Sequence, residues 1–160
     1  MQQHNIDPVW DENSIILILG SFPSVKSREQ QFFYAHPHNR FWRVLAEVTD
    51  TPLAQTADEK KKILLQCRIA LWDVIRSCDI TGSSDSSIKN VVPNDLGIIL
   101  SNSSVGRIFT NGATADRLYK KYCEKQTGIA AVRLPSTSPA NAAYSLERLV
   151  QEWKIIAEYL

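Results

Sequence analysis

The chain has 160 residues, of which 44% are hydrophobic and 22% charged, and this length suffices for one domain with its own core. The formal net charge of +1 argues against a protein that binds nucleic acid through its overall charge, so any such binding needs a local basic surface. Three scattered cysteines, Cys67, Cys78 and Cys123, argue against a disulfide framework, a zinc site and an iron–sulfur cluster.

The predicted strands are short apolar runs that end at turn-forming residues. Residues 15–19 (IILIL) stop at Gly20, as expected of a strand buried on both faces. Residues 69–75 and 107–111 follow as the second and third strands, and residues 130–134 as the fourth. Amphipathic stretches separate the runs, so we expect a single α/β domain over residues 1–160, in which helices cover both faces of a mostly parallel four-stranded sheet.

The predicted helices lie between and after these strands, at residues 41–48, 57–66 and 115–122, and in a last stretch whose apolar face runs from residue 146 to residue 160. Ser138 and Pro139 are residue types that favour a helix start, so we expect the last helix to begin there. Residues 1–13 are mostly polar and are expected to form an N-terminal tail without a targeting signal. No apolar run approaches the roughly 20 residues that span a bilayer, so we expect a cytoplasmic protein without a membrane partner. We also expect a monomer.

In parallel sheets the ligand site lies beyond the carboxyl ends of the strands, which directs attention to the segments that follow them. After the first strand, residues 20–27 (GSFPSVKS) resemble a phosphate-binding loop, but Val25 and Pro23 are incompatible with one. Phe22 is either a platform on which a flat ligand stacks or a plug at the edge of the sheet. The next segment contains His36 and His38, which are too few for a catalytic metal site.

Asn39 stands where the helix at residues 41–48 should begin, and its simplest role is that of an N-cap. Residues 20–46 contain four basic side chains and only one acidic one, Glu29. This excess of positive charge indicates either a phosphate-contacting surface or a solvated helix face. Small hydroxyl residues at 134–141 (LPSTSPAN) suit either an anion site at a helix start or simple capping. The basic residues are Lys26, Arg28, Arg40 and Arg43.

Two long motifs, residues 20–42 (GSFPSVKSREQQFFYAHPHNRFW) and residues 134–141 (LPSTSPAN), resemble those of the deoxyinosine (hypoxanthine)-DNA glycosylase family of the uracil-DNA glycosylase superfamily. The resemblance extends over nearly the whole chain and includes residues 81–90 (TGSSDSSIKN) and 110–112 (TNG). It implies a three-layer α/β/α domain that acts on DNA without a cofactor or metal. The expected reaction is hydrolysis of the N-glycosidic bond of a flipped, deaminated base in base excision repair.

The resemblance also implies roles for individual residues. Asn39 takes the catalytic position, because the aspartate that classical uracil enzymes carry in the first motif is missing here. Its carbonyl would orient a water while its NH₂ group contacts base or sugar. The residues implied for the base pocket are Gly20, Ser21, Phe22, Pro23, His36, His38 and Asn111. Those implied for DNA binding are Lys26, Arg28, Arg40, Ser136, Thr137, Ser138, Pro139 and Asn141.

Several alternatives remain open at the level of sequence. The base could be hypoxanthine, uracil or xanthine, or the enzyme could remove mismatched uracil or thymine with the same fold. A protein that binds damaged bases without cleavage, and a hydrolase of free nucleosides, are further alternatives. Asp73, Asp85, Asn90 and Asn111 each have either a functional role or a turn-capping one. We expect no lyase step, because Lys26 suits a phosphate contact better than a Schiff base.

Overall fold

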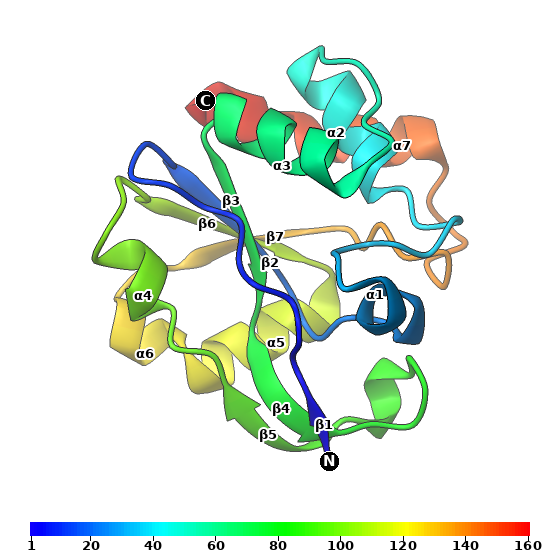
Figure 1. Cartoon of the computed structure of the whole chain (residues 1–160), viewed down its shortest axis with the longest axis vertical. Coiled ribbons are helices and arrows are strands. Elements are labelled where there is room, and N and C mark those ends of the chain that lie inside the picture. The colour runs from blue at the N-terminus through cyan, green and yellow to red at the C-terminus, as the bar shows by residue number, and fades with distance from the viewer.

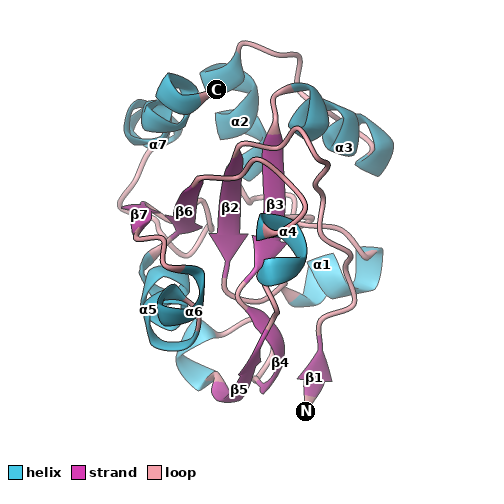
Figure 2. Ribbon diagram, turned by 90° about the vertical axis from the view of Figure 1, so that its left-hand side faces the viewer, coloured by secondary structure: helices cyan, strands magenta, loops and turns pink.

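The computed structural model describes residues 1–160, and its centre is a four-stranded parallel sheet in the order β3-β2-β6-β7 (Figure 2). Every residue of the two strands β2 and β3 is buried, as expected of strands covered on both faces. The strands are β2 (Ile16–Gly20), β3 (Ile69–Asp73), β6 (Arg107–Asn111) and β7 (Ala131–Leu134).

Helices cover both faces of this sheet, which confirms the predicted three-layer fold (Figure 1). Helices α2, α3 and α7 lie on one side, and α5 lies on the other against β6 and β7. The four main helices are α2 (Phe41–Thr49), α3 (Ala57–Gln66), α5 (Ala113–Tyr122) and α7 (Leu146–Trp153). Shorter elements are α1 (Val25–Gln30), α4 (Gly97–Leu100), α6 (Glu124–Thr127), and the 3-10 turns η1 (Asp85–Ser87) and η2 (Lys154–Tyr159).

The start of the last helix differs from the prediction. Helix α7 begins at Leu146 with Ser145 as its N-cap, whose side chain accepts from the amide of Arg148. Residues 138–145 form an irregular loop instead, because their carbonyl groups turn toward Arg40 rather than along a helix axis. The prediction that Ser138 and Pro139 start this helix was therefore wrong.

The predicted N-terminal tail is also wrong, because residues 1–13 pack against the domain. Strand β1 (Gln2–Gln3) pairs with β4 (Ile75–Asp79), which pairs with β5 (Lys89–Pro93) in a small antiparallel sheet. Val9 forms an antiparallel bridge with Leu71 at the outer edge of β3, and Ile6 is buried nearby. The apolar residues that anchor the segment are too few and too widely spaced to give a periodic pattern.

The core consists of 33 contiguous buried residues, and the carboxyl ends of β2, β3 and β6 all emerge on one side of it. Gly20, Asp73 and Asn111 are the last residues of these strands. All three cysteines are free thiols, and burial raises the pKa of each. No helix is long and apolar enough to cross a membrane.

Candidate active site

A cavity of about 560 Å³ opens at the carboxyl ends of the strands. It brings together most of the residues that the sequence motifs selected, although they lie up to 119 positions apart in the chain. The predicted residues that line it are Gly20, Ser21, Phe22, Pro23, His36, Asn39, Asn111, Ser136, Thr137, Ser138 and Pro139. A second cavity, of about 570 Å³, adjoins the first and shares Asp85, Asn111, Ser136, Ser138 and Ala140 with it. Asn141 lines only this second cavity.

A chain of hydrogen bonds joins the two sequence motifs inside the cavity. The Thr137 hydroxyl donates to Asn39 Oδ1 over 2.9 Å and accepts from Asn111 Nδ2 over 3.0 Å. Asn111 Oδ1 also accepts from the Thr137 amide, over 3.0 Å. Thr137 is completely buried, so these bonds fix the position of Asn39 relative to the loop that follows β7.

The carbonyl of Asn39 is fully occupied. Besides the Thr137 hydroxyl, Oδ1 accepts the amide of Phe41 over 3.0 Å, in the manner of a helix cap. An amide oxygen has two lone pairs, so little capacity remains to orient a water, contrary to the role expected from sequence. The NH₂ group of Asn39 makes no hydrogen bond within the protein, and Asn39 lines the cavity. Asn39 therefore presents a hydrogen-bond donor to a bound molecule.

Arg40 does not extend into solvent as a phosphate contact would. Its guanidinium group donates to the carbonyls of Ser138 over 2.9 Å and Asn141 over 3.1 Å, and to that of Tyr144. Its backbone amide donates to the carbonyl of Thr137 over 3.1 Å. Arg40 thus holds the loop after β7 from within, and its charge is directed at backbone oxygens of the protein itself.

Of the other basic residues, Lys26 and Arg43 are exposed, on α1 and α2. Arg28 folds back, so that one nitrogen donates to the carbonyl of Gly82 over 2.7 Å and the guanidinium lies 5.4 Å from the centre of the Phe22 ring. Phe22 is 9% exposed and lines the cavity, but Arg28 covers part of its ring. Only a limited part of Phe22 is therefore free for stacking.

The two neighbouring histidines separate in the structure. His36 lines the cavity, whereas His38 is exposed outside it, and the His38 amide donates to His36 Nδ1 over 3.1 Å. No group of three or more histidine, cysteine or acidic side chains is arranged to hold a metal ion.

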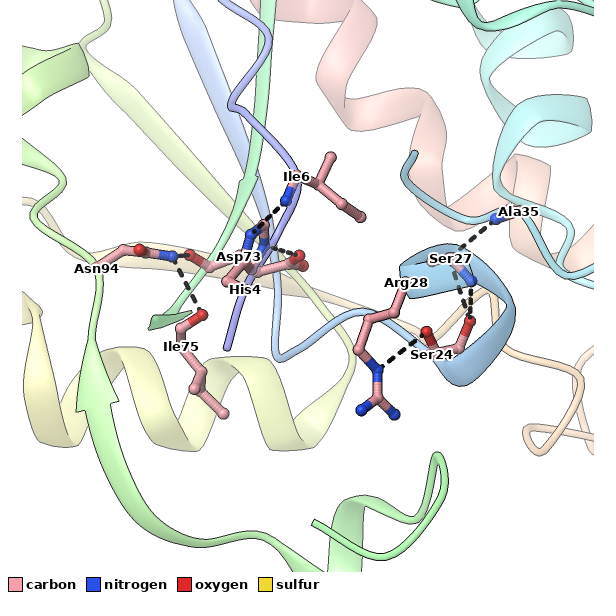
Figure 3. A network of polar contacts seen from close by, with 9 residues as sticks. All are labelled: His4, Ile6, Ser24, Ser27, Arg28, Ala35, Asp73, Ile75 and Asn94. Atoms are coloured by element: carbon pink, nitrogen blue, oxygen red, sulfur yellow. Dashed lines mark hydrogen bonds and ion pairs between the residues drawn. The ribbon is translucent and has the colours of Figure 1, made fainter. Parts of the chain in front are cut away.

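Sequence reasoning left the role of Asp73 open and missed Tyr34 and His4, which meet Asp73 at the floor of the cavity. Asp73 ends β3 and is buried, and His4 Nε2 lies 2.8 Å from its Oδ2 (Figure 3). Tyr34 lines the cavity with a buried hydroxyl that has no hydrogen-bond partner. Burial, and secondarily the charge of Asp73, raises the pKa of Tyr34 far above its usual value. The acid at a strand end was a usable signal, but His4 was assigned to a tail.

Gly20 explains why the first motif begins with glycine. A Cβ atom at this position would lie 2.4 Å from Asp73 Oδ1 and 2.9 Å from the Tyr34 hydroxyl. Both distances are shorter than any tolerable contact, so only glycine lets these two polar groups approach the base of the cavity together.

The serine-rich loop at residues 82–87 forms one wall of the cavity. The Ser83 hydroxyl accepts the amide of Val25 over 2.9 Å, which ties the loop to α1. Asp85 borders both cavities and accepts the Ser21 hydroxyl at 3.3 Å. Asp85 is an exposed residue, and partial shielding of its carboxyl group from water by neighbouring atoms raises its pKa. Asn90, by contrast, has a positive φ of 54° and bonds Asp79, which is a local turn role.

Fold and cavity define a protein of the class that binds its ligand at the carboxyl ends of a parallel sheet. The chain belongs to the uracil DNA glycosylase superfamily, whose family model matches residues 8–159. This match confirms the resemblance inferred from the two motifs.

Individual relatives agree over most of the chain. A protein of Methanosarcina acetivorans named hypoxanthine DNA glycosylase is 37% identical over 158 residues, or 98% of each chain. One from Methanosarcina barkeri with the same name is 35% identical over 100 residues, or 62% of this chain and 63% of that one. A solution NMR structure of a Methanosarcina acetivorans protein, described as a candidate uracil DNA glycosylase, superposes with a TM-score of 0.80 at 34% identity. The superposition covers 96% of this chain and 95% of that one.

Proposed function

We propose that this protein is a monofunctional DNA glycosylase that removes hypoxanthine from DNA, with uracil and xanthine as further substrates. The observation that carries the proposal is the cavity in which Thr137 joins Asn39 to the loop after β7. Membership of the superfamily and the names of the Methanosarcina relatives support the same activity. A cavity of about 560 Å³ falls within the usual range for small-ligand sites and can hold a base extruded from the duplex.

The proposed mechanism stabilises the departing base. As the N-glycosidic bond breaks, positive charge develops on the sugar and negative charge on the base, and water adds late at C1′. The Asn39 NH₂ group donates to the base as its charge develops, which lowers the barrier electrostatically. The amides of Ser21 and Phe22 have no hydrogen-bond partner within the protein and are further donors at the cavity.

A lyase step is not part of this proposal. Cleavage of the strand by β-elimination needs an amine that forms a Schiff base at C1′. No lysine lines the cavity, and Lys26 lies outside it on α1. The product of the reaction is therefore an intact strand that carries an abasic site.

Comparing an oligonucleotide with a free nucleoside tests the proposal. The protein should convert a labelled duplex containing one deoxyinosine into a product that breaks only after hot alkali. It should leave free deoxyinosine intact, because a free nucleoside has no DNA strand that the loop after β7 could bind. Strand breaks without alkali would add a lyase step, and hydrolysis of the free nucleoside would replace the proposal with a nucleoside hydrolase.

Replacing Lys26 by alanine is expected to weaken binding to all DNA sequences about equally. Lys26 is exposed on α1 beside the cavity, so loss of one phosphate contact should reduce the slope of log K against log salt by about 1. Fluorescence anisotropy at several salt concentrations measures this slope. Lys62→Ala, at an exposed position of α3 that contributes nothing to the cavity, is the control. An unchanged slope for Lys26→Ala would show that Lys26 does not contact a DNA phosphate.

The Asp85 carboxylate is expected to support the reaction only above its raised pKa. Partial desolvation raises this pKa and the charge of Asp73 adds to the effect, whereas Ser21, Thr114 and Arg117 oppose it. Because the Asp85 carboxylate borders the cavity, we assign it the role of stabilising the positive sugar. As pH falls, Asp85 takes up a proton at a higher pH than an ordinary aspartate, and this stabilisation is lost. Single-turnover rates should therefore fall on the acid side. Asp85→Asn should lower the plateau rate roughly tenfold and remove this acid limb. An unchanged acid limb would contradict the role.

A further inference from the structure

The polar groups at the floor of the cavity have no part in the mechanism above, yet two of them have unused hydrogen-bonding capacity. The amide of Ile6 donates to His4 Nδ1 over 3.3 Å, so this nitrogen carries a lone pair and the ring proton sits on Nε2. His4 Nε2 therefore donates its proton to Asp73 Oδ2 over 2.8 Å (Figure 3).

One oxygen of Asp73 remains free. Oδ1 makes no hydrogen bond within the protein, and Asp73 lines the cavity although its side chain is only 5% exposed. This oxygen points toward Gly20, on the side where the Tyr34 hydroxyl also approaches. A buried carboxylate oxygen that is held by a neighbouring donor and can only accept is a strong, fixed acceptor for a ligand N–H.

Tyr34 supplies the complementary donor. Its hydroxyl is buried without a partner, which costs free energy unless a ligand accepts the proton. Its backbone has φ of 50°, a left-handed conformation that is rare for a bulky side chain, and its ring stacks on Phe41 at 4.3 Å and 13°. Strain of this kind persists where the surroundings impose it and is concentrated at functional sites.

We infer that Asp73 and Tyr34 together recognise the lactam edge of a deaminated base, with His4 as the positioning residue for Asp73. The inference rests on the proposed function and assigns the groups that select its substrate. Hypoxanthine, xanthine and uracil each present a ring N–H beside a carbonyl oxygen. The N–H donates to Asp73 Oδ1, and the carbonyl accepts from the Tyr34 hydroxyl.

The same arrangement rejects adenine and cytosine. These bases carry a ring nitrogen lone pair beside an amino group, which is the inverse pattern of donor and acceptor. The ring lone pair would face an Asp73 oxygen that also only accepts, so these two groups would stay unpaired and repel each other, although the Tyr34 hydroxyl could still accept from the amino group. Guanine and thymine share the lactam edge, so Asp73 and Tyr34 do not by themselves exclude these bases; for guanine, its stable pair with cytosine also resists extrusion.

Substitutions at the cavity floor test the inference. The substrates are duplexes with one deoxyinosine or deoxyadenosine, assayed by single-turnover excision, and their hydrolysis-resistant 2′-fluoroarabino analogues, assayed by binding. In Asp73→Asn the amide oxygen faces the His4 donor, so its NH₂ group faces the base. We expect hypoxanthine excision to fall roughly 100-fold, and the preference for inosine over adenosine in both assays to fall at least about tenfold.

Removing the Tyr34 hydroxyl distinguishes a role in base recognition from a role in stability. Tyr34→Phe removes an unpaired buried group, so we expect an equal or higher melting temperature together with roughly tenfold slower excision. Tyr119→Phe is the matched control, because the Tyr119 hydroxyl bonds Thr127 and the carbonyl of Ile129 away from the cavity. This control should lose stability and keep its excision rate.

His4 is tested by rescue. His4→Gln keeps an N–H donor and should retain the preference for inosine, whereas His4→Phe should lose most of it even in folded protein. Unchanged preference in Asp73→Asn and Tyr34→Phe, with wild-type protein that excises hypoxanthine, would overturn the inference and leave the proposed function standing. Wild-type protein that prefers the inosine analogue in binding but never excises the base would overturn the function instead, and the inference would stand as one about binding.

Discussion

Replacing Asn39 by alanine is expected to lower single-turnover excision of hypoxanthine roughly 100- to 1,000-fold, the usual cost of losing one preorganised donor. The variant should bind DNA nearly as well as the wild type. Asn39 also accepts from the Phe41 amide, so about 1 kcal/mol of stability should be lost with this cap. Rates under single-turnover conditions, binding by anisotropy and thermal melting separate the three effects.

Asn39→Asp is the decisive control for this prediction. It keeps acceptor oxygens for Phe41 and Thr137 but replaces the NH₂ donor by an oxygen. We expect the stability of this variant to return while the excision rate stays low. An aspartate variant with a wild-type rate would show that Asn39 acts as an acceptor toward water, and the donor role assigned to its NH₂ group would be wrong.

Arg40→Ala is expected to have the largest effect on the loop after β7. The guanidinium binds three backbone carbonyls of this loop, and hydrogen bonds from charged groups contribute about 1.5–3 kcal/mol each. The loss should lower the free energy of unfolding by roughly 3 kcal/mol and weaken binding to DNA, because the loop is no longer held in place. Chemical denaturation and anisotropy measure the two quantities.

The salt dependence of DNA binding distinguishes an Arg40 that only holds the loop after β7 from an Arg40 that contacts a phosphate. If Arg40 acts only through the loop, the slope of log K against log salt stays the same in Arg40→Ala. Arg43→Ala, at an exposed position of α2, is the matched control and should leave stability unchanged. If Arg40→Ala instead reduced the slope of log K against log salt by about 1 and lost no stability, Arg40 would be a phosphate contact.

Local patterns predicted the parallel sheet well. The strand at residues 107–111 and the helix at 57–66 have the predicted limits, and Thr56 and Glu59 form a capping box at the start of that helix. Continuous apolar runs determine buried strands, and caps determine helix ends, through neighbours in sequence. The second sheet was missed because β1, β4 and β5 are strands of only two to five residues without a long apolar run, and they form only by pairing with one another.

Site residues that belong to the sequence motifs were predicted, whereas site residues that only tertiary contacts bring to the cavity were missed. Gly20 and Asn39 line the cavity as the resemblance implied, although their catalytic roles remain predictions. Nothing near His4 in sequence indicates that it reaches Asp73, 69 positions away. Likewise, the positive charge of Arg40 suggested DNA, and only the fold reveals that backbone carbonyls of the loop surround it.

The central claim is most directly tested by single-turnover excision from duplexes that carry one deoxyinosine, deoxyuridine or deoxyxanthosine, with hot alkali to reveal abasic sites. We predict alkali-dependent breaks that are fastest at deoxyinosine, slower at the other two lactam bases and absent at deoxyadenosine. No excision of any base by folded protein would contradict the assignment and indicate a protein that only binds damaged DNA.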